Sequence, residues 1–217
     1  MPEDEIDIIL DVSNIMSTFC PEGDFTCHPH RVTLETFNTL RNGPLNIDYP
    51  KEFDPYLKQT IKKTFSTVNK LNELNVDEIV EKLMSIQDDL DELKVDKKNQ
   101  AYHTLALASV SVAIESTKLW HAAFNDPEHD FNTMVEIGKR RRLQLYIPLP
   151  QIDMTKVINA DIYGSVAGGL LELQANSTLF FLPFEFIIKA LLRSISFSSY
   201  AIFDFTNITS APWYPSP

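Results

Sequence analysis

Residues 153–176 read DMTKVINADIYGSVAGGLLELQAN, and a second apolar run, beginning LFFLPFEFIIKALL, occupies residues 179–205. Ala160, Gly164 and Gly168 stand four residues apart in the first segment. On a helix they therefore stack on one face and form a groove without large side chains. A partner helix can approach closely along such a face. Because the second run carries bulky side chains that could fill the groove, we predict an apolar helical hairpin over residues 153–205.

The chain before this hairpin carries a succession of helix signals. Asp54 followed by Pro55 is typical of an N-cap and the first helical position, and Asn75 with Glu78 has the spacing of a capping box. Asp153 is in place to cap the first helix of the hairpin. Together with the spacing of apolar side chains, these signals predict helices near residues 5–19, 32–40, 54–71, 75–93 and 98–124.

The longest predicted helix, residues 98–124, is the one expected at the centre. Its middle, residues 105–114, reads LALASVSVAI and is apolar or small nearly all round. A helix without a polar face is surrounded by other elements. We therefore predict an all-α protein, a helical bundle with a C-terminal apolar helical hairpin. It would form one structural domain: a helical body over 1–152, the hairpin packed on it over 153–205, and a Pro-rich tail over 206–217.

The charged residues limit the kinds of partner that we expect for this protein. The chain has 217 residues and a net charge of −11, so it repels phosphate backbones and we expect no nucleic-acid partner. Charged side chains also interrupt the apolar C-terminal third too often for a membrane-spanning helix, although contact with a membrane surface is compatible with the sequence. The first residues, MPEDEID, are acidic where a signal peptide is basic, so we expect a cytoplasmic protein if Met1 is the true start.

Two groups of residues have the composition of a metal site. The first is Cys20, Cys27, His28 and His30, whose thiolates and imidazoles suit zinc, although their spacing matches no standard zinc motif. Alternatively, the two cysteines form a disulfide in an exported protein or remain free thiols in a cytosolic one.

The second group follows the longest predicted helix and comprises His121, Asp126, Glu128 and His129. Histidines and carboxylates together serve metal binding and acid–base catalysis, so this group could support a metal-dependent hydrolase. The alternative is a helix end followed by a solvated loop, with His121 placed favourably near the helix C-terminus.

A basic run follows this loop at Lys139, Arg140, Arg141 and Arg142. Such a run could contact anionic lipid headgroups beside an interfacial hairpin. More often a run of this kind is a surface patch, which here could pair with the acidic first half of the chain.

Three short segments carry a resemblance to a known group of proteins. Residues 116–120 read STKLW at the end of a helix of small residues, residues 160–169 read ADIYGSVAGG, and residues 194–201 read SISFSSYA. The pattern resembles a group of uncharacterised exported, lipoprotein-like proteins of Bacteroides-type bacteria, which carry a C-terminal Asp-x-x-Gly-x-x-x-Gly segment rich in small residues. This resemblance implies a cell-envelope or extracellular setting and no known activity. From its acidic first residues we expect no leader, unlike the group, and the second apolar run has Phe and Leu where the group has Gly and Ala.

We therefore expect a non-catalytic, exported or cell-surface accessory protein that binds an unidentified protein or small ligand and needs no cofactor. The residues with the clearest expected role are Ala160, Gly164 and Gly168, which would pack helices together. Two alternatives come from other classes: the metal-dependent hydrolase, and a bacteriocin-like protein whose hairpin interacts with a membrane.

Overall fold

A computed structural model describes residues 47–132 and 153–175, together with residues 10, 12–14, 17, 34, 36, 195 and 197. This part of the chain contains helices and no strands, which confirms the prediction of an all-α helical bundle. Its elements are α3 (Pro55–Val68), the 3-10 helix η1 (Asn69–Asn72), α4 (Val76–Asp91), α5 (Gln100–Asn125) and α7 (Met154–Ala175). The helices predicted at 5–19 and 32–40, the second half of the hairpin and the tail fall almost wholly outside the described residues.

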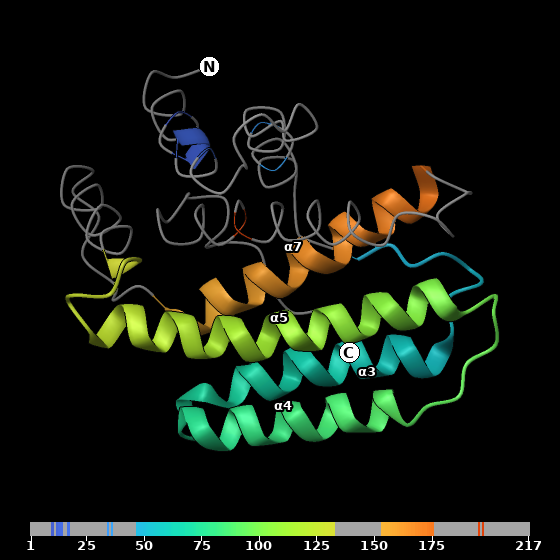
Figure 1. Ribbon diagram of the computed structural model, residues 1–217, viewed down its shortest axis with the longest axis horizontal. Coiled ribbons are helices and arrows are strands. Elements are labelled where there is room, and N and C mark those ends of the chain that lie inside the picture. Colours follow the sequence, from blue (N-terminus) through green and yellow to red (C-terminus); the bar gives the residue numbers. More distant parts are fainter. Residues whose placement is uncertain are drawn as a thin grey trace.

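The four α-helices run alternately in opposite directions (Figure 1). α5 packs against α3, α4 and α7, and its most extensive contact is with α7. The helix without a polar face is therefore the central one, as its sequence predicts. None of the helices that the structure describes is both long enough and apolar enough to cross a membrane.

Three of the helices begin where the capping signals predict. Asp54 Oδ1 accepts hydrogen bonds from the backbone N–H of Tyr56 at 2.8 Å and of Leu57 at 3.2 Å. The capping box of α4 has both of its bonds, because Asn75 Oδ1 accepts from the Glu78 N–H at 2.9 Å and Glu78 Oε2 accepts from the Asn75 N–H at 3.1 Å. These contacts satisfy backbone donors that have no partner inside the helix.

Asp153 does the same for α7. Its Oδ1 accepts from the backbone N–H of Thr155 at 3.0 Å and of Lys156 at 3.4 Å. The first half of the predicted hairpin is therefore a helix that starts at the expected residue. The second half lies outside the described residues except for Ile195 and Phe197.

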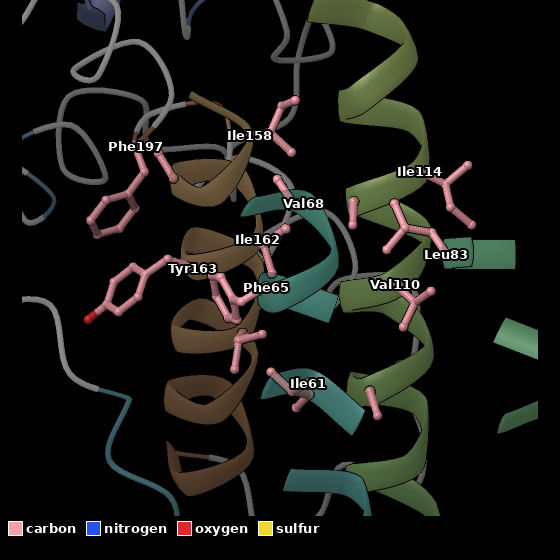
Figure 2. Close-up of a cluster of buried hydrophobic side chains, with 14 of the residues drawn as sticks. Ile61, Phe65, Val68, Leu83, Val110, Ile114, Ile158, Ile162, Tyr163 and Phe197 are labelled. Carbon is pink, nitrogen blue, oxygen red and sulfur yellow. The ribbon is translucent and has the colours of Figure 1, made fainter. Parts of the chain in front are cut away.

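Apolar side chains from all four α-helices meet in one core (Figure 2). α3 contributes Leu57, Ile61, Phe65 and Val68, and α4 contributes Ile79, Leu83, Ile86 and Leu90. Tyr56 is one of the large apolar side chains of α3 but is 46% exposed, whereas its neighbour Leu57 is fully buried. Neighbouring residues of a helix point about 100° apart, so one side chain can face the core while the next faces solvent.

The small residues of α7 are buried, and their neighbour is α5. Ala160, Gly164 and Gly168 all lie inside the protein. Gly164 and Gly168 follow Asp161 by three and seven residues, so they share the face of α7 from which Asp161 contacts α5. α7 packs against α5, while the prediction that the second apolar run fills the small-residue face concerns residues that lie almost wholly outside the described part of the chain. From the second run, Phe197 packs edge-on against Tyr163, with ring centroids 5.0 Å apart.

Candidate functional site

A buried polar contact joins α5 to α7. Asp161 is 5% exposed and Trp120 is 2% exposed. Trp120 Nε1 donates to Asp161 Oδ2 at 2.7 Å, and Ser116 Oγ donates to the same oxygen. A carboxylate buried among apolar side chains is costly unless hydrogen bonds compensate it, and these two donors supply part of that compensation.

Helix geometry explains why these three side chains converge. Ser116 and Trp120 are four residues apart, so they project from the same face of α5. Asp161 occurs in the first half of α7, which packs along this face in the opposite direction. The contact therefore lies near the C-terminal end of α5 and the beginning of α7, where the two ribbons run side by side (Figure 1).

A cavity of about 450 Å³ opens beside this contact. Its size is in the range of pockets that hold small organic molecules, which are mostly apolar with a few polar groups. The buried residues Ser116, Trp120 and Asp161 form its floor. The other lining residues are Val112, Glu115, Lys118, Leu119, Ala122, His129, Phe131 and Ile195.

One wall of the cavity belongs to the loop that follows α5. The Glu128 N–H donates to Asp126 Oδ1 at 3.0 Å, and the Phe131 N–H donates to His129 Nδ1 at 3.2 Å. Asn132 Nδ2 then bonds back to the carbonyl oxygen of Ala123 at 2.8 Å. These bonds fold the loop against the end of α5 and hold the rings of His129 and Phe131 at the cavity.

Aromatic rings stand around the floor. The rings of Trp120 and Phe131 have centroids 5.9 Å apart and an angle of 81° between their planes. The imidazole of His129 lies against Phe131 at 6.0 Å. The edge-to-face arrangement of Trp120 and Phe131 is a favourable one for aromatic pairs, and it gives the cavity two walls that are nearly perpendicular.

The charges at the rim offset each other. Lys118 Nζ lies 2.8 Å from Glu115 Oε1, and both side chains are exposed. A pair of this kind contributes little to stability, but it leaves the rim close to neutral.

The four residues of the predicted hydrolase site lie at the end of α5 and in the loop that follows it. His129 lines the cavity, whereas His121, Asp126 and Glu128 are exposed. The Asp126 carboxylate serves the turn described above, and His121 accepts a hydrogen bond from Asn125 Nδ2 through its backbone oxygen. Among the described residues, no group of three or more His, Cys, Asp or Glu side chains could hold a metal ion.

The remaining predicted site residues fall outside the described part of the chain. They are the candidate zinc ligands Cys20, Cys27, His28 and His30, and the basic run Lys139, Arg140, Arg141 and Arg142. The zinc, disulfide and headgroup hypotheses therefore remain predictions from sequence.

Sequence reasoning from the residues alone did not identify the cavity or its floor. Ser116, Trp120 and Asp161 were noticed only as parts of two of the segments that carry the resemblance. One signal was available: Asp161 is the only acidic residue between Met154 and Leu171, within a segment of apolar and small residues. A carboxylate inside a helix that lacks a polar face must find buried partners.

The cavity has polar groups at its floor and apolar side chains along its walls, which can cover an apolar body. Comparison with known proteins adds no family to this description, since the chain matches no protein-family model, no curated protein and no solved structure.

Proposed function

We propose that this protein is a non-catalytic binding protein that takes a small, largely apolar molecule into the cavity between α5 and α7. The observation that carries the proposal is the cavity itself: about 450 Å³, walled mostly by apolar side chains, with one buried carboxylate at its floor. Few convergent polar groups in an apolar pocket are characteristic of small-molecule sites. From the resemblance we further propose that the protein acts as an accessory factor in the cell envelope or the extracellular space.

The position of the cavity supports binding by a largely preformed site. Its floor is built from two long helices, α5 and α7, which make the most extensive contact between helices in the described part of the chain. The side chains at the floor are fixed by hydrogen bonds, and its second aromatic wall is held by a hydrogen-bonded loop. Little of the protein therefore has to become ordered when a ligand binds, and this small entropy cost favours affinity.

A cavity-filling substitution tests the proposal. Ala122 lines the cavity and is partly exposed, so Ala122→Phe places a ring in the cavity without overpacking the core. Ala101, an exposed residue in the first turn of α5, offers the same substitution away from the site. The probe is a neutral solvatochromic dye, titrated against the full chain and followed by its fluorescence.

We expect saturable binding to the unmodified protein and to Ala101→Phe, with at least tenfold weaker binding to Ala122→Phe. Far-ultraviolet circular dichroism of all three proteins establishes that they are equally helical. Equal dye affinity in the three proteins, or no saturable binding to the unmodified protein, would refute the proposal.

A further inference from the structure

His129 brings a hydrogen-bond donor to the cavity. It belongs to the loop that forms one wall, and its Nδ1 accepts a hydrogen bond from the backbone N–H of Phe131 at 3.2 Å. A ring nitrogen that accepts a hydrogen bond carries no proton, and the proton of a neutral imidazole is then on the other nitrogen. The loop therefore fixes the tautomer of His129 in which Nε2 is the donor.

This donor points away from the loop backbone. The two nitrogens of an imidazole lie on different sides of the ring, so when Nδ1 faces the Phe131 N–H, Nε2 is directed elsewhere. In the part of the chain that the structure describes, Nε2 has no hydrogen-bond partner. Since His129 is a half-buried lining residue of the cavity, its Nε2–H is available to a ligand there.

The other neutral side-chain donors of the cavity already have an acceptor. The Trp120 indole donates to Asp161 Oδ2 at 2.7 Å, and the Ser116 hydroxyl donates to the same oxygen. Among the described lining residues, the Nε2–H of His129 is therefore the neutral donor that remains for a ligand. A ligand that uses it must carry a hydrogen-bond acceptor.

The charges around the cavity favour an acceptor without charge. A protonated amine has donors only and cannot accept a hydrogen bond from His129. An anion could accept one, but the lining lysine, Lys118, is paired with Glu115 at 2.8 Å. A chain with a net charge of −11 also lowers the local concentration of anions. An uncharged carbonyl oxygen meets neither obstacle.

From these observations we infer that the ligand is an uncharged carbonyl compound with an apolar body, and that His129 is the residue that selects it. The Nε2–H donates to the carbonyl oxygen, and the apolar body lies along Val112, Leu119 and Ala122. This inference rests on the proposed function, because it assigns the ligand class of the same cavity.

Three matched probes test the inference by competition against the neutral dye. They are 4-phenyl-2-butanone, its isopropenyl analogue, in which a CH₂ group replaces the carbonyl oxygen, and 3-phenylpropanoate. All three share one phenethyl body, and the alkene reports the apolar contribution alone. The measured quantity is the ratio of the affinity of the ketone to that of the alkene. We expect this ratio to fall at least threefold when the His129 donor is removed, and 3-phenylpropanoate to bind most weakly of the three.

Two substitutions at His129 separate the donor from the loop bond. In His129→Asn the amide oxygen can still accept the N–H two residues on, but the amide nitrogen does not reach the position of Nε2. His129→Gln does the reverse, because its longer side chain carries an N–H to that position and gives up the acceptor at Nδ1. We expect the ratio to fall in His129→Asn and to be retained at least in part in His129→Gln. His121→Asn, at an exposed position outside the lining, is the control and should leave the ratio unchanged.

The outcomes separate this inference from the proposal beneath it. A ratio that is unchanged in His129→Asn, a loss at least as great in His129→Gln as in His129→Asn, or tightest binding of 3-phenylpropanoate would overturn the carbonyl inference. In each of these cases dye binding that Ala122→Phe still blocks leaves the binding function standing. Dye binding that is insensitive to Ala122→Phe removes both.

Discussion

Trp120 and Asp161 are 41 residues apart in the sequence and are joined by a hydrogen bond of 2.7 Å between the indole Nε1 and the carboxylate Oδ2. Both side chains are almost completely buried. The bond connects the central helix α5 to α7, and the Ser116 hydroxyl shares the same acceptor. One carboxylate oxygen therefore satisfies two buried donors of α5.

Removing that oxygen should be costly. In Asp161→Ala the Trp120 N–H and the Ser116 hydroxyl lose their acceptor, and each buried donor left unsatisfied costs about 1–3 kcal/mol. We expect the free energy of unfolding, measured by urea denaturation, to fall by at least about 2 kcal/mol. Asp161→Asn retains an acceptor and should cost less than Asp161→Ala. An unchanged denaturation midpoint in Asp161→Ala would show that the contact does not hold the two helices together.

The small-residue face of α7 gives a second prediction. Gly164 is buried on the side of α7 that meets α5, so Gly164→Leu should overpack the contact and destabilise the protein by about 1–3 kcal/mol or more. Gly168→Ala adds a single methyl group, and its gain in helix propensity of up to about 1 kcal/mol should offset part of the crowding. Ala101→Leu, on the exposed surface of α5, is the control for adding a leucine to a helix. Thermal melts of the three variants would contradict this packing if Gly164→Leu and Ala101→Leu behaved alike.

The capping box of α4 gives a third prediction. Asn75→Ala removes the acceptor of the Glu78 N–H, and loss of an N-cap costs about 1 kcal/mol. Glu78→Gln retains a side chain that can bond the Asn75 N–H and should cost less. A smaller loss for Asn75→Ala than for Glu78→Gln, measured by chemical denaturation, would contradict this account.

The fourth prediction concerns alkaline pH. Burial raises the pKa of Tyr163 from 10.0 to about 12. The unfolded chain therefore releases this proton at lower pH than the folded protein does. The contribution of the shift to stability is complete below about pH 10 and is lost as the pH rises towards 12. This rise in the pKa of Tyr163 corresponds to about 3 kcal/mol at most in the free energy of unfolding.

Tyr163→Phe should reduce the loss of unfolding free energy between pH 9 and pH 11.5. It should not abolish that loss, because burial also raises the pKa of Tyr49. Tyr56→Phe, at an exposed position, is the matched control. Identical pH profiles for Tyr163→Phe and the unmodified protein would rule out the shift at Tyr163.

The sequence predicts those features of the helices that neighbouring residues and composition determine. The caps at Asp54, Asn75 and Asp153 and the central position of α5 depend on neighbouring residues and on composition, both of which can be read directly from the chain. Tyr56 and Leu57 show the limit of this reading. Helical periodicity leaves an uncertainty of one residue at a helix end, and the choice between Tyr56 and Leu57 depends on how α3 is oriented in the bundle.

The candidate site could not be predicted in the same way. Ser116 and Trp120 share a helix face, but that face becomes a site only because α7 brings Asp161 against it, and no local signal specifies that register. The residues with the most suggestive chemistry in the sequence, His121, Asp126 and Glu128, instead lie on an exposed helix end and its loop. The cavity arises from tertiary packing, which a list of residue types does not contain.

The order of the helices along the chain also implies an order of folding. α3, α4 and α5 are consecutive in the chain and contact one another, so they can assemble through short loop closures. α7 joins them from beyond residues 133–152, a longer closure that costs more entropy. We therefore expect the three-helix part to form early and α7 to dock late. The cavity needs both parts, so the ability to bind a ligand would be the last property the chain acquires, and a bound ligand would favour the completed protein over any intermediate that lacks α7.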